Sequence, residues 1–217
     1  MKNRRTRAIL AIISNCIIIL TTAAISVSFF LLGTDETANF AAFHYFTTLS
    51  NLLAALTAVP LILCLCRGLR KNQFDIPAWI HSLRFVGTTA VTVTITTVLF
   101  FLAPQFHFAP FLFVGINFFL HILNPILAIL SFVLFEADSG IPKKSLPLAV
   151  LPTLLYGIVY VVMVVFIGEE NGGWRDFYGF NIGGFWYISM AVMLAGTFAL
   201  AALLRWLRNR NSKKLAE

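Results

Sequence analysis

The stretch Phe111–Phe135, FLFVGINFFLHILNPILAILSFVLF, decides how this sequence folds. It exceeds the roughly 20 apolar residues that a membrane-spanning helix needs, yet it carries His121 near its middle. Asn117 lies four residues before His121 and Asn124 three after it, so on a helix the three share one face. An ionisable group at this depth usually faces a bundle interior or a cavity. The stretch therefore predicts a membrane helix whose polar face is either a functional site or a structural contact.

The composition places the whole chain in the membrane. Of its 217 residues 59% are hydrophobic and only 12% are charged, about half the charge of a soluble domain. The fold class predicted is all-α, a polytopic bundle of six transmembrane helices forming a single domain over residues 1–217. The net charge of +7 does not indicate a nucleic-acid partner, because the basic residues sit at the ends of the apolar runs.

We expect spans at about 8–32, 41–66, 81–103, 111–135, 146–168 and 184–206. The apolar run after the basic N-terminus is too long for a signal peptide and ends without a small-residue cleavage site, so it is expected to be retained. Of the 16 basic residues, all but Arg175 fall on one side of these spans. The positive-inside rule then predicts that both termini are cytoplasmic. The compact loops suit a bacterial plasma membrane.

The longest outer loop, from Glu169 to Ile182, is rich in aromatic residues. Its Trp174, Phe177, Tyr178 and Phe180 are typical of an interfacial belt, and they also suit a lid over the mouth of the bundle.

A second polar patch opens the second span, where Thr47, Thr48, Ser50 and Asn51 follow one another closely. Thr47 and Asn51 are four residues apart and share a face. Thr47 is expected ~9 Å and His121 ~15 Å from the outer ends of their spans, at 1.5 Å per residue. The two side chains can meet if the second and fourth spans are neighbours. A purely structural interpretation is that these hydroxyls bond to their own helix.

A hydroxyl beside an imidazole is the minimal pair of nucleophile and base. His121 would take the proton of Thr47 as its oxygen attacks an ester carbonyl, and would return it to the leaving alcohol. Asn51, Asn117 or Asn124 would orient the histidine or donate to the oxyanion. No carboxylate lies within a predicted span, so the site would be a dyad rather than a triad.

Other polar residues in the spans are expected to serve packing. Thr88, Thr92 and Thr96 share a face with Arg84, whose side chain is expected to reach the inner surface or to bind an acidic group. Tyr160, four residues after Tyr156, packs within the bundle or reaches the site. His44, His81 and His107 are expected at the membrane interfaces, and neither the histidines nor the cysteines show the spacing of a metal site.

Four short motifs carry a resemblance to a known family: YFTTLSNLL (45–53), HILNP (121–125), LPTLLYGIVY (151–160) and GGWRDFYGF (172–180). They resemble the bacterial branch related to the androgen-induced proteins of animals. The animal members are multi-pass membrane hydrolases that cleave fatty acid esters of hydroxy fatty acids with an intramembrane threonine and histidine. The resemblance implies that Thr47, after Tyr45 and Phe46, is the threonine and that His121 is the histidine. The animal proteins have one more residue between the histidine and the proline.

The sequence thus predicts hydrolysis of lipid acyl esters, with Thr47 as threonine nucleophile, a lipid or fatty acid ester substrate and no cofactor or metal. A binding or transport protein for a lipid or amphiphile using the same cavity is the alternative. A structural membrane subunit is a third interpretation, and a b-type haem protein would need a second histidine as deep as His121. The oligomeric state is open at this stage, as is the choice between Thr47 and Thr48.

Overall fold

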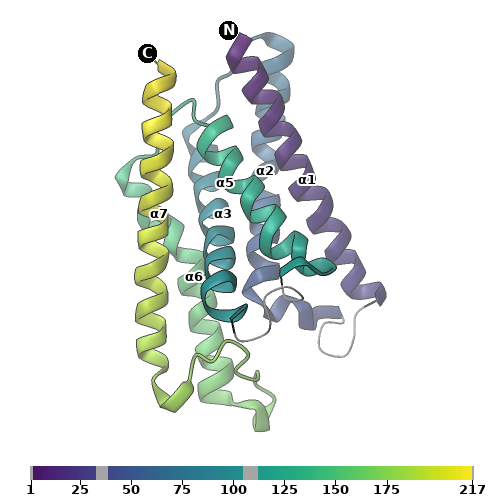
Figure 1. Cartoon of the computed structure of the whole chain (residues 1–217), viewed down its shortest axis with the longest axis vertical. Helices are drawn as coiled ribbons and strands as arrows, with labels where there is room; N and C mark the ends of the chain where they lie inside the picture. Colours follow the sequence, from purple (N-terminus) through teal and green to yellow (C-terminus); the bar gives the residue numbers. More distant parts are fainter. Residues whose placement is uncertain (1, 33–38, 105–111, 217) are drawn as a thin grey trace.

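The computed structural model describes residues 2–32, 39–104 and 112–216, which are helical with short connections and contain no strand. Figure 1 shows the helices running lengthwise, with both termini at the same end. Six of the helices are long and apolar enough to cross a membrane, so the predicted all-α bundle of six spans is confirmed. These spans are Arg4–Leu31, Phe46–Lys71, Ala78–Leu102, Phe118–Phe135, Lys143–Ile167 and Trp186–Leu215.

Several spans are built from consecutive helical pieces. The elements in chain order are α1 (Lys2–Leu32), η1 (Asn39–His44), α2 (Phe46–Lys71), α3 (Ala78–Thr97), η2 (Val98–Leu102), η3 (Phe118–Leu123), α5 (Asn124–Leu130), η4 (Ser131–Phe135), η5 (Lys143–Ser145), α6 (Leu146–Val161), η6 (Val162–Ile167), η7 (Glu169–Asn171), η8 (Ile182–Gly184) and α7 (Trp186–Ala216). The segments η2, η3, η4 and η6 are π-helical turns.

Two predicted boundaries are wrong for local reasons. The second span begins at Phe46 rather than near 41, because Asn39–His44 forms the separate 3₁₀ helix η1. The fourth span is continuous from Phe118, since Gly115 has a φ of +58°, which a right-handed helix does not accommodate. The predicted start, Phe111, lies outside the described residues. His121 therefore lies only three residues into its span, ~4.5 Å from the end at 1.5 Å per residue, instead of near the middle.

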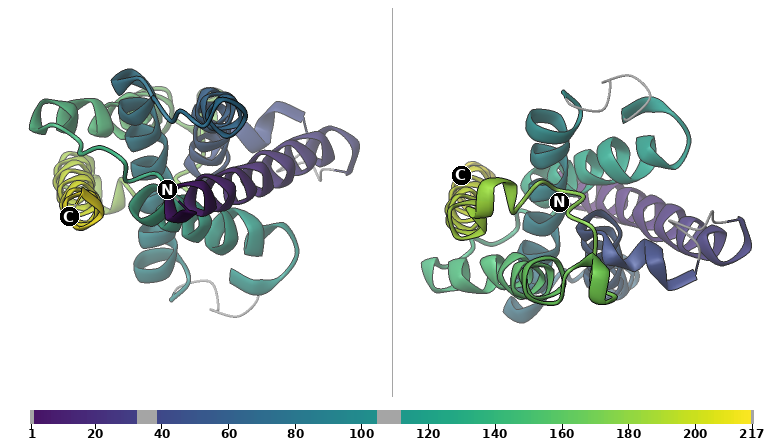
Figure 2. Two further views of the ribbon diagram at one scale, coloured as in Figure 1. Left: turned by 90° about the horizontal axis from the view of Figure 1, so that it is seen from above. Right: turned by 90° about the horizontal axis from the view of Figure 1, so that it is seen from below.

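The two ends of the bundle carry different connections. The terminal end carries both termini and the connections 72–77 and 136–142, and the distal end carries η1 and the residues 168–185 between η6 and α7. Helix α3 lies at the centre and contacts α2, α5, α6 and α7. Figure 2 shows α7 at one edge of the bundle and α1 reaching toward the opposite edge. The patches around Thr47 and His121, which were predicted to carry the chemistry, lie near the starts of the second and fourth spans and thus at the distal end.

Arg84 does not reach the surface, and the prediction that it would do so is wrong. Its side chain is fully buried and donates through Nη2 to Glu136 Oε1 at 3.0 Å and through Nε to Oε2 at 3.2 Å. The acidic group that it binds is thus inside the protein, just after the fourth span. Burial alone would raise the pKa of the Glu136 carboxyl, but the Arg84 guanidinium, the Arg208 charge and the Ser131 hydroxyl lower it below its ordinary value.

Arg208 joins this cluster from α7. Its guanidinium donates through Nη2 to His81 Nδ1 at 2.8 Å and to the Glu136 carbonyl at 2.6 Å, and it stacks 4.4 Å over the Phe132 ring. His81, which was expected at the interface, lies in the first turn of α3 and is buried against Arg208. Charged groups can be buried in a membrane bundle when they are paired in this way, so the terminal end of the bundle is held by polar contacts.

Candidate functional site

A pocket of about 380 Å³ lies in the distal half of the bundle, between α3, η2, α6 and α7. Its size falls within the roughly 300–1,000 Å³ of ordinary ligand sites. The wall runs along α7 from Ile188 to Leu200 and along α3 and η2 from Val93 to Leu102. At 1.5 Å per residue these segments span ~14–18 Å, about half of a ~30 Å hydrocarbon core. The pocket is therefore long, narrow and within the spans.

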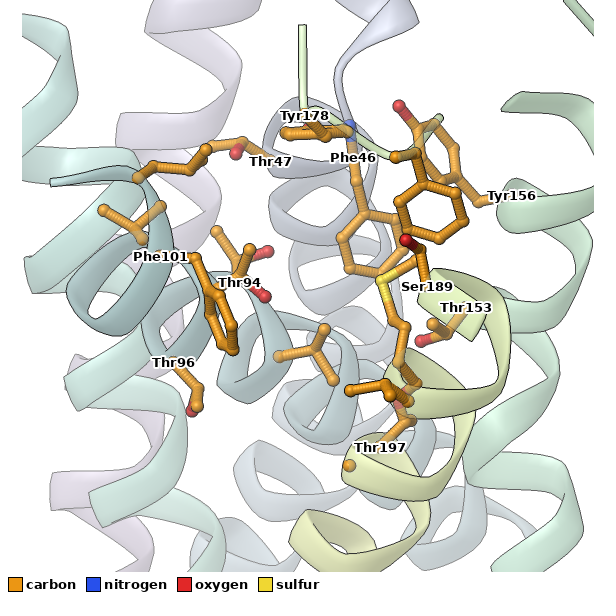
Figure 3. Close-up of a pocket in the computed structure, with 18 of the residues that line it drawn as sticks. Phe46, Thr47, Thr94, Thr96, Phe101, Thr153, Tyr156, Tyr178, Ser189 and Thr197 are labelled. Atoms are coloured by element: carbon orange, nitrogen blue, oxygen red, sulfur yellow. The ribbon is translucent and has the colours of Figure 1, made fainter. Parts of the chain in front are cut away.

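The wall is apolar with isolated hydroxyl groups, and several of these bond to their own helix. Thr96 Oγ1 donates to the Thr92 carbonyl and Thr197 Oγ1 to the Met193 carbonyl, each at 2.8 Å. Thr153 Oγ1 is buried and has no hydrogen-bond partner among the described residues. The serine and threonine residues of the wall are Thr47, Thr94, Thr96, Thr97, Thr153, Ser189 and Thr197, most of which are labelled in Figure 3.

Thr47 lies on the pocket wall, as a residue that acts on a bound ligand must. Figure 3 shows it at one end of the pocket, beside Phe46 and Tyr178. Tyr178 belongs to the distal loop, residues 168–185 between η6 and α7. Its hydroxyl accepts a hydrogen bond from the Phe46 amide at 3.0 Å. Burial raises the pKa of Tyr178 to about 12, although the Phe46 amide and the hydroxyls of Tyr156 and Thr47 each favour the ionised form. At neutral pH Tyr178 is thus a neutral phenol that can donate a hydrogen bond beside Thr47.

Asn51 connects the turn of Thr47 to the turn of His121. Its Nδ2 donates to the Thr47 carbonyl at 2.8 Å and to the Leu120 carbonyl at 3.1 Å. In the π-helical pattern of η3 the backbone partner of Leu120 would be Pro125, which has no N–H, so the Leu120 carbonyl is left for a side chain. The second and fourth spans therefore touch at the distal end, which the sequence left open.

Asn124 completes an amide network between three helices. Its Nδ2 donates to Asn51 Oδ1 at 3.0 Å and to Thr22 Oγ1 at 3.3 Å, and its Oδ1 accepts from Thr21 Oγ1 at 2.8 Å. Both asparagines are completely buried, so these bonds satisfy groups that would otherwise be costly in the interior. Asn51 and Asn124 thus link α1, α2 and α5 by hydrogen bonds, and Asn51 also bonds to the Thr47 carbonyl.

His121 itself lies buried on η3 and is not among the residues that line the pocket. It follows Leu120 directly, so its turn and that of Thr47 are joined by the single amide of Asn51. Asn117 precedes η3 and is half-buried. The structure thus brings the two predicted turns together but presents only Thr47 to the pocket.

The distal loop folds back over the bundle and is fixed by Tyr160. The Tyr160 hydroxyl donates to Asp176 Oδ1 at 2.9 Å and accepts from the Tyr178 amide at 3.0 Å. Asp176 in turn accepts from the amides of Phe180 and Asn181, each at 2.8 Å. The loop aromatics Trp174, Phe177, Tyr178 and Phe180 pack with Tyr156 and Tyr160. Tyr160 therefore holds the distal loop in place by hydrogen bonds, and it is not among the residues that line the pocket.

Sequence reasoning missed several residues that line the pocket. Tyr178 was predicted only as part of a belt or lid, and its motif GGWRDFYGF gave no sign that its phenol would face Thr47. Ser189 and Gly196 of α7 carried no signal, because single small residues are common in membrane helices. Within the described ranges no three histidine, cysteine or acidic side chains are grouped so that they could hold a metal ion, and His107 lies outside these ranges. Comparison of the chain with family models, curated proteins and solved structures finds no match.

Proposed function

We propose that this protein binds the acyl chain of a lipid or fatty acid ester inside the membrane, in the pocket between α3, α6 and α7. The observation that carries the proposal is the position of Thr47: a hydroxyl on the wall of a long apolar pocket within the spans. The chain lies along Val98, Val192 and Leu200, and the ester carbonyl lies beside Thr47 and Tyr178. The neutral Tyr178 phenol supplies a hydrogen-bond donor for that carbonyl.

The orientation follows from the charges. The terminal end carries nearly all of the basic residues of the chain, so we place it in the cytoplasm, and the distal end with Thr47 at the outer face of a plasma membrane. The ligand is then a lipid of the outer leaflet.

Photolabelling tests whether the pocket holds an acyl chain. The purified protein in nanodiscs is exposed to a fatty acid ester with a diazirine on its acyl chain, and the adducts are located by mass spectrometry. We expect adducts on Val192 and other wall residues. Gly196→Phe should abolish them, because a Cβ at Gly196 points into open space. Ala195→Phe, on the exposed neighbouring face of α7, is the matched control. Labelling unchanged by Gly196→Phe would refute the binding site.

Hydrolysis of the bound ester is the second candidate function. The observation that favours it is the bridge from the Thr47 carbonyl through Asn51 to the Leu120 carbonyl, which joins the two turns of the predicted dyad. The Thr47 oxygen would attack the carbonyl carbon while His121 takes its proton. His121 would then return the proton to the leaving alcohol, and water would cleave the threonyl ester. This chemistry requires the imidazole to reach the Thr47 hydroxyl when the ligand is bound.

A fluorophosphonate probe and a branched fatty acid ester separate hydrolysis from binding alone. Thr47→Ala and His121→Ala should each abolish probe labelling and turnover, whereas Thr48→Ala should retain both. Each variant is checked for folding by size exclusion and thermal unfolding. A well-folded wild-type protein that binds the diazirine ester but neither reacts with the probe nor releases product would exclude hydrolysis and leave binding.

A further inference from the structure

Helices α3 and α7 are fastened together at the terminal end. The Arg208 guanidinium on α7 donates to His81 Nδ1 on α3 at 2.8 Å. About one turn closer to the distal end, Phe85 of α3 is fully buried in one cluster with Ala201 and Leu204 of α7. A charged hydrogen bond and a tightly packed aromatic ring both resist separation, so this half of the helix pair is closed.

The same two helices are separated in their distal halves, where the pocket lies between them. On the α3 side the wall includes Phe101, which is 58% exposed, and on the α7 side Ile188 and Val192, which are 51% and 60% exposed. Gly196 lies on this wall, and a Cβ built there would meet no atom within 4 Å. Residues that line an internal pocket and are also half exposed mark an opening to the outside of the bundle. Because these residues belong to membrane spans, that outside is lipid.

Close contacts bound the pocket on two other sides. Between α6 and α7, a Cβ on Gly157 would come within 2.8 Å of Met190 Sδ, so the two helices touch there. At the distal end the loop is fixed by the bonds of Tyr160 and Tyr178, and Phe180 on the pocket wall is only 8% exposed. Among the large hydrophobic residues of the described wall, those that are at least half exposed, Phe101, Ile188 and Val192, all lie at the gap beside α7.

We propose that the gap between the distal halves of α3 and α7 is a lateral portal, through which an amphiphile already dissolved in the bilayer slides into the pocket. This inference rests on the proposed binding of an acyl chain and specifies the kind of ligand and its route. The ligand is a membrane-partitioned lipid rather than a solute taken from water. Its apolar chain passes between Phe101 and Val192 while its polar group stays near the membrane interface, at the height of Thr47 and Ser189.

Thiol labelling in nanodiscs tests the route, since both membrane faces are then accessible. Gly196→Cys is introduced in a protein whose Cys16, Cys64 and Cys66 are replaced by alanine. We expect a membrane-soluble maleimide to label Gly196→Cys, and a charged methanethiosulfonate to leave it unlabelled. Glu170→Cys, which is exposed on the distal loop, should react with both, and the fully buried Ala201→Cys with neither. Labelling of Gly196→Cys by the charged reagent, or by neither reagent, would overturn the portal.

The rate of photolabelling by the diazirine ester gives a second, independent readout. Val192→Trp at the rim should slow the appearance of adducts. Leu203→Trp should leave the rate unchanged, because Leu203 is similarly exposed on α7 but lies between the pocket and the terminal end. Equal rates in both variants would refute the portal even though the chain still binds. If the wild-type protein forms no adduct at all, acyl-chain binding fails instead, and the thiol labelling still decides whether the pocket opens to lipid.

Discussion

The buried charge cluster at the terminal end makes a quantitative prediction for Glu136→Gln. The Glu136 carboxylate is 1% exposed and accepts from Arg84 twice, from Ser131 Oγ at 2.6 Å and from Asn15 Nδ2 at 3.2 Å. Glutamine keeps the shape but removes the carboxylate charge that is paired with Arg84, and places an NH₂ group among donors. Removing one partner of a buried ion pair typically costs about 3–5 kcal/mol, and we expect a loss of this size in the free energy of unfolding.

The assay is equilibrium unfolding of the protein in detergent micelles, followed by circular dichroism. Glu170→Gln serves as the control, because Glu170 is exposed and surface substitutions usually change stability by less than about 0.5 kcal/mol. A loss below about 1 kcal/mol for Glu136→Gln would mean that water solvates Arg84, and the reasoning from burial would be refuted.

The double replacement Arg84→Met with Glu136→Leu separates the pair from the cost of an unpaired charge. Both charges then leave together and apolar groups of similar volume fill their place, which is often neutral or stabilising. We expect the double variant to be more stable than either Glu136→Leu or Arg84→Met alone. A double variant whose loss equals the sum of the single losses would show that the two side chains are not coupled.

Three further predictions concern pH, helix packing and the loop. The folded state lowers the pKa of Glu136 below its ordinary value of 4.5, so the carboxylate contributes fully to stability above that pH, and this contribution is lost as the pH falls through the lowered pKa. Arg84→Met leaves the buried carboxyl without this partner, and acid neutralises it. The loss of unfolding free energy relative to the wild type should therefore be largest near neutral pH and should shrink as the pH falls, as measured by unfolding at a series of pH values. Gly87→Ala should destabilise the protein by about 1–3 kcal/mol, because its Cβ would collide with Thr57 Oγ1, whereas Gly196→Ala in open space should be neutral or stabilising by up to ~1 kcal/mol, both measured by unfolding. Tyr160→Phe removes two hydrogen bonds to the distal loop and should speed hydrogen exchange of the amides at 176–182, with little effect on the exchange of α3.

The span count could be predicted because hydropathy and length are properties of each helix by itself. The contacts between helices could not be predicted in this way, because periodicity shows which face of a helix is polar but not which residues that face contacts. Asn51 and Asn124 were both identified as polar residues beside the expected site, and the sequence held nothing to show that they bond to each other across 73 residues. Arg84 was predicted to reach the surface for the same reason: its partner Glu136 lies 52 residues away, just beyond another span.

The candidate site was predicted in part. The patch around Thr47 was found because hydroxyl and amide groups are rare enough at the start of an apolar run to stand out. The position of His121 along its span differs from the expected one, because Gly115 interrupts the helix and the sequence alone does not reveal a positive φ. The role of Tyr178 was missed because it depends on how the loop folds back, and the Asp176 carboxylate fixes that fold through three hydrogen bonds, two to loop amides and one to Tyr160.

The polar residues of α3 explain why one half of this helix is closed and the other half is open. A charged group cannot satisfy itself within its own helix, so Arg84 must find a partner on another segment and thereby draws the segments together. A threonine can donate to the carbonyl four residues before it, as Thr92 and Thr96 do at 2.7 and 2.8 Å, and needs no neighbour. On the pocket wall, Thr96 is satisfied within its own helix and Thr94 shares a hydrogen bond with Ser50 of α2, so neither hydroxyl needs a partner on α7. The same helix thus joins a terminal half that is bonded to α7 through His81 and Arg208 to a distal half that lines the pocket beside α7.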